Sequence, residues 1–291
     1  MRRTSVVSIA LLAATATAIA AGSACTRRDQ VRIETEAAKA LVSDEQENAI
    51  GLQVASELGK EHVKYLADPQ VNAYVSSITN RIFPLASKDR PGVKWEVKVI
   101  DDPKTVNAFA VPGGHLFVYS GLLLAAEDES EVAGVLAHET GHVVARHTAR
   151  QMVDAFGLQA IASLATGQNP TLLEQITTKI AGTGVLLAHS RQSEREADEF
   201  GARYSSGAGF DPHGLATFFQ KLGKKEGSQP QIMAWISDHP LTPERIGNVN
   251  AYIAKHHLNG KERNPEAHAA VKVRLGQLSP EAAQIHNVVG H

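Results

Sequence analysis

Cysteine is almost absent from this chain: Cys25 is the only one among 291 residues. A single cysteine excludes an intrachain disulfide framework and a cysteine-rich zinc finger, because both need several thiols. An excess of charge is missing as well, since 29 Lys and Arg residues stand against 31 Asp and Glu residues. A net charge of -2 is a poor electrostatic match for a polyanion, so we expect no nucleic-acid partner.

Long apolar runs are also missing, apart from one near the N-terminus. Residues 6–21 form an apolar run behind Arg2 and Arg3, and small residues follow at 22–24. This order is typical of a bacterial secretory signal, and the run is short for a helix that spans a membrane. We therefore expect residues 1–24 to be a signal peptide and the remainder to be exported.

The lone cysteine follows this signal directly. Cys25 stands where bacterial lipoproteins carry the cysteine that is acylated, and the arrangement resembles a lipobox except at Gly22, where Leu, Val or Ala is usual. The alternative is ordinary cleavage after Ala24 and simple secretion. Lipidation would attach the chain to a membrane through a tether over residues 26–42. Because Thr26 is not an acidic retention signal, we expect a periplasmic protein anchored to the outer membrane.

The rest of the chain predicts one mostly helical α+β domain over residues 43–255. With 43% hydrophobic residues the chain can build a core, which excludes wholesale disorder. An alternating pattern predicts a strand at 95–100, and two further strands are predicted at 107–111 and 115–119, with turns at 101–103 and 112–114. Helical patterns are found at 43–63, 69–78, 128–150, 191–206, 215–222 and 243–254. We expect the strands to form a small antiparallel sheet beside the helix over 128–150, and residues 256–291 to form a peripheral tail.

The helix over 128–150 carries the pattern H-E-x-x-H at His138, Glu139 and His142. Residues four apart lie on the same face of a helix, so both imidazoles can bind one metal ion. Zinc accepts nitrogen and oxygen ligands, and Glu139 stands where it can take a proton from water at the metal. The alternative, a buried helix with incidental histidines, would leave costly polar groups buried without partners.

A hydrolytic zinc site also needs a third protein ligand. Glu194 and Asp198 lie four residues apart on one predicted helix face. One of these carboxylates could bind the metal while the other orients a ligand histidine. Taken alone, this charged run is better explained as a solvated helix with Arg–Glu pairs.

A resemblance to a known family resolves this choice. Five blocks occur in order, at residues 107–114, 121–123, 138–142, 190–198 and 239–245. Together they resemble the gluzincin metallopeptidases of the HtpX and CAAX-prenyl-protease type, family 48 of the metallopeptidases. The likeness is strongest to its periplasmic, often lipid-anchored members, and it covers residues 43–255. It implies a zincin-type metallopeptidase domain.

The resemblance also implies roles for single residues. His138, His142 and Glu194 would bind one zinc ion per chain, Glu139 would be the general base, and Asp198 would support a ligand from behind. These roles agree with what the spacing of the same residues allows.

Three further features acquire a role only through the resemblance. His239 and Arg245 match a late pair near the metal, and in relatives this histidine either stabilises the oxyanion or occupies the open position on zinc and keeps the enzyme latent. An edge strand that would pair with an extended substrate matches Asn107, Ala108, Phe109 and Ala110. Without the resemblance, a plain core strand and a turn that leads into a helix are simpler interpretations.

Other segments are expected to lie around the site. The apolar, glycine-interrupted stretch 151–189 lies between the two ligand helices and is predicted to cover the cleft as a lid. His147, five residues after His142, is expected to point away from the ligand face. Surface positions are expected for His213, His256 and His257.

The sequence thus predicts a zinc-dependent endopeptidase of the bacterial cell envelope. It would hydrolyse misfolded or misassembled exported proteins, with Glu139 activating water at the zinc and His239 as a candidate for latency. The alternative is a lipid-anchored, chaperone-like assembly factor for outer-membrane proteins with weak or no proteolysis, since a fourth protein ligand would close the site. A structural lipoprotein with a vestigial site is disfavoured by the complete set of ligands.

Overall fold

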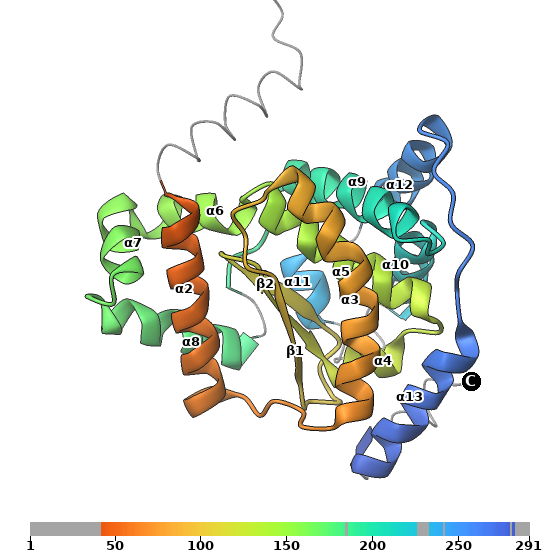
Figure 1. Cartoon of the computed structure of the whole chain (residues 1–291), viewed down its shortest axis with the longest axis horizontal. Helices are drawn as coiled ribbons and strands as arrows, with labels where there is room; N and C mark the ends of the chain where they lie inside the picture. The colour runs from red at the N-terminus through yellow and green to blue at the C-terminus, as the bar shows by residue number, and fades with distance from the viewer. Residues whose placement is uncertain (1–41, 184–185, 226–232, 241, 280, 283–291) are drawn as a thin grey trace, which may run out of the picture. The chain divides into compact units, whose positions relative to one another are not determined.

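The computed structural model describes residues 42–183, 186–225, 233–240, 242–279 and 281–282, all within one compact unit, Ala38–His291. Its helices are α2 (Asp44–Glu57), the π-helix η1 (Leu58–His62), α3 (Pro69–Asp89), α4 (Ser120–Ala125), α5 (Glu129–Val144), α6 (His147–Phe156), α7 (Leu158–Ala165), α8 (Pro170–Thr183), α9 (Arg191–Gly207), α10 (Gly214–Lys225), α11 (Met233–Asp238), α12 (Pro243–Lys255) and α13 (Pro265–Leu278). Its strands are β1 (Glu96–Ile100), β2 (Ala108–Val111) and β3 (His115–Tyr119) (Figure 1). This confirms the predicted α+β, mostly helical class.

The predicted signal peptide, Cys25 and nearly all of the predicted tether lie outside the described residues. Within the described part of the chain, no helix combines the length and the apolar character needed to cross a bilayer.

Local hydrogen bonds explain why two of the predicted helices begin where they do. Ser43 caps α2: its Oγ accepts from the Gln46 N–H at 3.2 Å, and Gln46 Oε1 accepts from the Ser43 N–H at 2.9 Å. Asp128 caps α5 by accepting from the Glu131 N–H at 3.1 Å. The Glu131 carboxylate accepts from the Glu127 N–H at 2.8 Å, one residue before the position that a capping box requires.

The sheet is mixed, with the strand order β1-β3-β2. β2 and β3 pair antiparallel through the glycine turn at 112–114, whereas β1 pairs with β3 in parallel. The predicted antiparallel sheet is therefore right for one strand pair and wrong for the other. β1 and β2 do run in opposite directions, as the turn between them predicts, but β3 lies between them, so these two strands are not neighbours.

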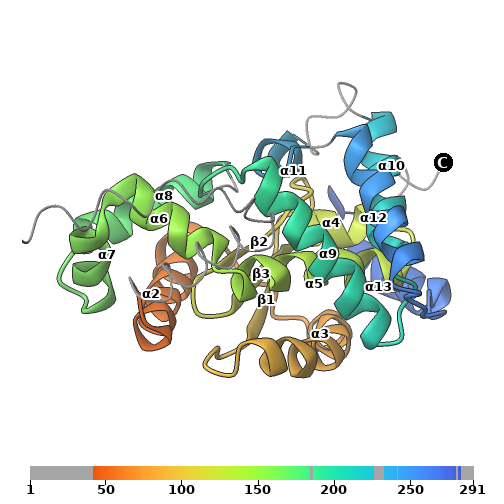
Figure 2. The same ribbon diagram turned by 90° about the horizontal axis from the view of Figure 1, so that it is seen from above.

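The sheet separates two apolar cores, because alternate strand residues point to opposite faces. Val99, Leu116 and Val118 pack with α3, α4, α5 and α10. On the other face, Phe109 and Phe117 pack with α2, η1, α6, α7 and α8, and their rings stack with centroids 4.8 Å apart. Figure 2 shows α6, α7 and α8 gathered near α2 at one end, with α9, α10 and α12 at the other.

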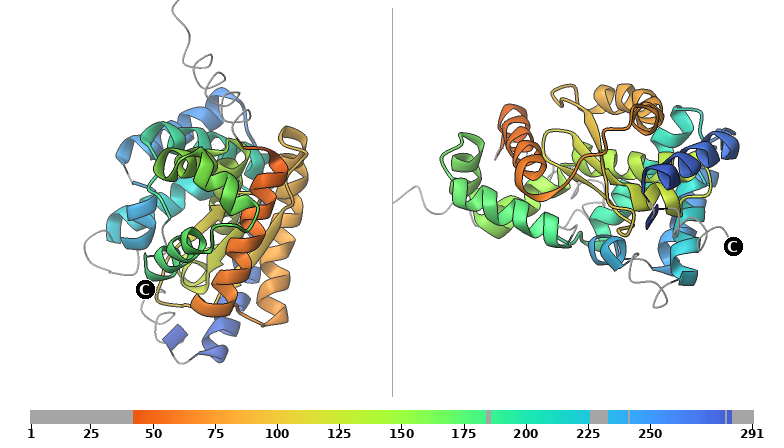
Figure 3. Two further views of the ribbon diagram at one scale, coloured as in Figure 1. Left: turned by 90° about the vertical axis from the view of Figure 1, so that its left-hand side faces the viewer. Right: turned by 90° about the horizontal axis from the view of Figure 1, so that it is seen from below.

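The stretch predicted to be a lid contains the end of α6 together with α7 and α8, which share a core with α2, η1 and the sheet. α7 and α8 pack against α2, and α8 also packs against η1 (Figure 3, left). Beyond α8, His189 reaches the cluster of metal-ligating side chains described below. That this stretch opens or closes over a substrate stays a prediction.

The C-terminal segment is more than the peripheral tail that the sequence predicted. α13 packs against α3 and α4 and contributes Val271 and Leu275 to the main core. His268 is buried beside Tyr74, with its Nδ1 2.8 Å from the tyrosine hydroxyl. Two apolar residues four apart allow one face of α13 to pack against the main core, although most of the segment is polar.

Helices α5 and α9 approach each other closely at glycines. A Cβ atom at Gly141 would lie 2.6 Å from the Phe200 Cβ and 3.2 Å from the Ala197 carbonyl oxygen. A Cβ at Gly201 would lie 3.4 Å from the His138 Cα. These glycines therefore let the backbone of α9 come within reach of the histidines on α5.

We expect Gly141→Ala to lower the free energy of unfolding by about 1–3 kcal/mol, because the added methyl group overpacks the contact between α5 and α9. Chemical denaturation would measure this. Gly247→Ala is the matched control: it lies within α12, where an added Cβ meets nothing within 4 Å. There the helix propensity of alanine should stabilise the protein by up to about 1 kcal/mol. A Gly141→Ala protein as stable as the wild type would contradict the packing argument.

Candidate metal centre

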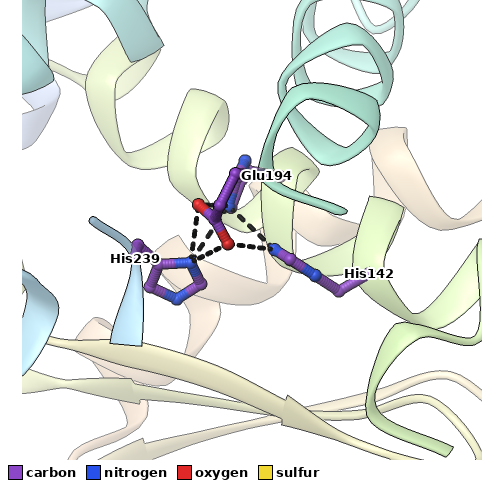
Figure 4. A group of neighbouring side chains, drawn as sticks. His142, Glu194 and His239 are labelled. Atoms are coloured by element: carbon purple, nitrogen blue, oxygen red, sulfur yellow. Dashed lines mark hydrogen bonds and ion pairs between the residues drawn. The ribbon is translucent and has the colours of Figure 1, made fainter. Parts of the chain in front are cut away.

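Four buried side chains converge from three segments of the chain. His138 and His142 come from α5, Glu194 comes from the first turn of α9, and His239 directly follows α11. One donor atom from each residue lies within 4.8 Å of all the others. Figure 4 shows the Glu194 carboxylate between the rings of His142 and His239. None of the four residues is more than 1% exposed.

The spacing of these donor atoms suits a small tetrahedral cation. His138 Nε2 lies 3.0 Å from His142 Nε2 and 3.3 Å from His239 Nδ1. Glu194 Oε1 lies 3.4 Å from His142 Nε2 and 3.1 Å from His239 Nδ1. Around a tetrahedral zinc ion with bonds of about 2.0–2.2 Å, neighbouring donors are about 3.3–3.5 Å apart. The donor set therefore fits a zinc ion in size and in chemistry.

Asp198 orients one of the histidines. Its Oδ1 lies 3.0 Å from His138 Nδ1, so the carboxylate favours a proton on that nitrogen and leaves the lone pair of Nε2 toward the cluster. Burial lowers the pKa of His138. The pKa of His142 lies well below its usual value, mainly because the ring is buried and also because His189 is close to it. Both imidazoles are thus neutral at physiological pH, as metal ligands must be.

Arg245, in the first turn of α12, holds two carboxylates together. Its Nη1 lies 2.8 Å from Glu194 Oε2, while Nε and Nη2 donate to the two oxygens of Asp198 at 2.9 and 2.7 Å. Burial raises the pKa of Glu194, but the charges of His239 and Arg245 outweigh it and hold that pKa well below its usual range. Glu194 is therefore ionised.

Three carboxylates are buried in the centre, and one guanidinium contacts two of them. Glu139, Glu194 and Asp198 are each no more than 2% exposed, and Arg245 contacts Glu194 and Asp198. A divalent cation held by the donors would add positive charge beside these carboxylates, and an uncompensated buried charge is costly.

His239 contacts the metal-ligating cluster and the predicted base at once. While its Nδ1 faces Glu194, its Nε2 lies 3.3 Å from Glu139 Oε1. Its ring stacks on Trp235 of α11, with centroids 4.4 Å apart. His239 thus occupies the space in front of Glu139 in this conformation.

The predicted substrate strand lies beside α5 but is covered. β2 is an edge strand of the sheet and packs against α5. Asn107, Ala108, Phe109 and Ala110 are all buried, with Ala110 the most exposed at 7%. The Thr148 hydroxyl, on α6, donates to the Ala110 carbonyl at 3.4 Å. The strand edge is therefore partly occupied by the chain itself.

The sequence analysis did not predict that two further histidines, His147 and His189, lie beside the centre. His147 was expected to point away from His142, and this is wrong, because their Nδ1 atoms lie 3.0 Å apart. The ring of His189 lies 3.9 Å from that of His142. The pattern H-E-x-x-H-x-x-x-x-H contained a signal for His147, whereas no spacing singles out His189. The expected surface positions are confirmed for His213, His256 and His257.

Comparisons with known proteins agree with this geometry. A family model described as "Peptidase family M48" matches residues 54–253. The mitochondrial metalloendopeptidase OMA1 of Schizosaccharomyces pombe is 37% identical over 180 residues, which are 62% of this chain and 52% of that protein. The OMA1 protein of Arabidopsis thaliana is 35% identical over 160 residues, 55% of this chain and 32% of that protein.

A bacterial relative matches as well. The beta-barrel assembly-enhancing protease of Escherichia coli is 29% identical over 194 residues, which are 62% of this chain and 39% of that protein. The chain thus spans about half of the length of the fission-yeast relative and less of the other two.

We expect about one equivalent of Zn²⁺ to bind and to raise the Tm of the protein, and a chelator to reverse the shift. A ligand that binds only the folded state adds about 2.7 kcal/mol at a hundred times its Kd. Glu194→Gln should weaken binding by more than about tenfold, since it removes a charged donor. Isothermal titration calorimetry would measure the stoichiometry, with Glu266→Gln, an exposed position on α13, as the matched control. Equal zinc affinity of both variants would exclude this donor set.

Proposed function

Because the chain belongs to peptidase family M48, we propose that it is a zinc-dependent endopeptidase of the bacterial cell envelope. One observation carries this proposal: the buried donors His138, His142 and Glu194 cluster with His239, whose Nε2 lies 3.3 Å from the Glu139 carboxylate. The relatives named as metalloendopeptidases support the reaction class. The substrates that we propose are misfolded or misassembled exported proteins.

The donor set defines what each residue would do. His138, His142 and Glu194 would hold one zinc ion, which as a Lewis acid supplies polarisation of the scissile carbonyl. Glu139 would take a proton from the attacking water and later deliver it to the leaving amine nitrogen. Asp198 would keep the His138 ring in its ligand orientation.

We assign Arg245, which the resemblance placed near the metal as a catalytic residue, a positioning role rather than direct contact with the oxyanion. All three of its guanidinium nitrogens have acceptors within the protein, from Asp198, Glu194 and the Pro240 carbonyl. A guanidinium held in this way fixes two carboxylates but is not aimed at a substrate.

His239 gives the enzyme a latent conformation in this proposal. As a fourth donor it takes the position that a substrate carbonyl needs, and it also contacts Glu139. A substrate would then bind only after His239 and α11 have moved away from Glu139. An extended chain would pair along β2, at Asn107 to Ala110, once that edge is uncovered.

A second candidate function rests on the same histidine. With four protein donors the centre resembles a closed, structural zinc site. A lipid-anchored, chaperone-like factor that assists outer-membrane protein assembly would need little or no proteolysis. The name of the Escherichia coli relative, which joins assembly and protease, supports both candidates.

Glu139→Gln should lower the cleavage of an unfolded protein substrate by about 10²–10⁴-fold while zinc binding is retained, because the amide cannot accept the proton. Time courses with the zinc-loaded proteins would measure this, with Glu266→Gln as the control. If wild type and Glu139→Gln are equally inactive, and both support outer-membrane assembly in cells, the assembly factor is the correct function.

His239→Ala should raise the same cleavage rate several-fold if His239 keeps the enzyme latent, because it frees the fourth position. If His239 instead stabilises the oxyanion, the rate should fall by about 10²–10³-fold. The sign of the change therefore separates the two roles.

For localisation, we propose that Cys25 is lipidated and anchors the chain to the outer membrane on its periplasmic side. Cys25→Ser should move the protein from the membrane fraction to the soluble periplasm, because the acyl chains are lost. Fractionation with mass analysis of the N-terminus measures both effects. An unmodified wild-type N-terminus in the soluble fraction would support simple secretion.

A further inference from the structure

A second imidazole lies behind His142, on the side away from the donor cluster. His147 Nδ1 is 3.0 Å from His142 Nδ1, and His147 Nε2 is 3.2 Å from Glu196 Oε2. The His147 side chain is 1% exposed, and that of Glu196 is 23% exposed. A continuous chain of contacts therefore runs from the donor cluster through His142 and His147 to a carboxylate near the surface.

A break in the backbone makes this contact. In an unbroken helix, five residues turn the chain by about 500°, so His147 would point about 140° away from His142. Instead α5 ends at Val144, and Arg146 adopts the left-handed conformation, with φ 60° and ψ 29°. α6 then begins at His147 and brings its ring back toward His142.

Arg146 is held in this unusual conformation by its side chain. A left-handed backbone is unfavourable for a long side chain. The Arg146 guanidinium is buried, its Nε donates to Glu47 Oε1 at 2.7 Å, and it also donates to the carbonyl of Val42. The local strain at Arg146 is therefore offset by buried ionic contacts with the start of the domain.

The direction of the hydrogen bonds follows from the chemistry of imidazole. A contact between two ring nitrogens is a hydrogen bond only when one of them carries a proton. Since His142 Nε2 faces Glu194, its lone pair serves a metal only when the His142 proton is on Nδ1. That proton is then donated to His147 Nδ1, and the proton on His147 Nε2 is donated to Glu196. This arrangement gives both contacts of His147 one donor and one acceptor.

We propose that His147 and Glu196 are positioning residues that fix the tautomer and the ring orientation of His142. The proposal rests on the metal centre of the proposed function. Asp198 acts on His138 directly, at 3.0 Å, whereas Glu196 acts on His142 through an interposed imidazole. Without the carboxylate, His147 can carry its proton on Nδ1 and donate it to His142. The His142 proton is then displaced to Nε2, and the ligand lone pair is lost.

Four variants test this relay. His147→Leu removes it, whereas His147→Asn keeps an acceptor oxygen near the former Nδ1. Glu196→Ala removes the carboxylate, whereas Glu196→Gln keeps an acceptor. Glu199→Ala, exposed on the same helix, and His256→Asn, exposed after α12, are the matched controls. Circular dichroism and the Tm show whether each full-length variant is folded.

The first readout is the Zn²⁺ affinity, measured by competition with a chromophoric chelator. His147→Leu and Glu196→Ala should weaken binding by about 10–100-fold, whereas His147→Asn, Glu196→Gln and the controls should stay within a few-fold of wild type. The double variant His147→Leu/Glu196→Ala should bind no more weakly than His147→Leu, because Glu196 acts only through His147. The visible spectrum of the Co²⁺-substituted protein should change in His147→Leu and return toward wild type in His147→Asn.

The second readout needs no metal. Nitrogen-15 NMR of the metal-free protein should place the His147 proton on Nε2, facing Glu196, in the wild type and on Nδ1 in Glu196→Ala. The relay is refuted if the tautomer does not change, if His147→Asn is as weak as His147→Leu, or if the two losses simply add. A wild-type protein that binds no zinc would refute the proposed function, and the tautomer measurement would still decide the relay.

Discussion

Three carboxylates lie buried together around the H-E-x-x-H segment, and most of the surrounding structure compensates for their charge. Glu194, Asp198 and Glu139 are removed from water where α5 and α9 pack against each other. Arg245 contacts two of these carboxylates. A divalent cation held by the four buried donors would supply further positive charge to this part of the core. Binding of such a cation would therefore also stabilise the fold.

This charge cluster depends on two departures from regular helix packing. Gly141 and Gly201 let α9 approach α5, so that a short carboxylate side chain reaches the histidines. Arg146 breaks the helix after the second ligand and turns the chain back toward it. Both features lower local stability, because glycine has a low helix propensity and the left-handed backbone conformation of Arg146 is strained. Packing at α9 and the ionic contacts of Arg146 with Glu47 offset that loss.

His239 connects the centre to the segment around α11. It contacts the donors through one nitrogen and Glu139 through the other, and its ring stacks on Trp235. One side chain therefore contacts both a candidate metal donor and the predicted base, which makes its position a natural point of control. A movement of α11 would expose the base and a metal position together.

Local patterns were sufficient for much of this protein. The H-E-x-x-H pairing depends only on the helix repeat, the start of α2 on Ser43, and the strand β1 on residue alternation, so the sequence alone predicted them. Local patterns did not predict which other residues lie beside these elements. That Glu194 and Asp198 are buried and ligand-like followed from family resemblance, because their charged surroundings resemble a solvated helix.

The remaining features depend on contacts between distant segments. The parallel pairing of β1, the burial of α13, and the approach of His189 are set by tertiary packing, which no local pattern encodes. His147 shows the limit most clearly: an ideal helix directs it away from His142, yet one left-handed residue reverses its direction. The sequence by itself determined which residues have the chemistry for the site. Only the tertiary structure decided which of them meet, because ion pairs and close backbone contacts between remote segments override local helical geometry.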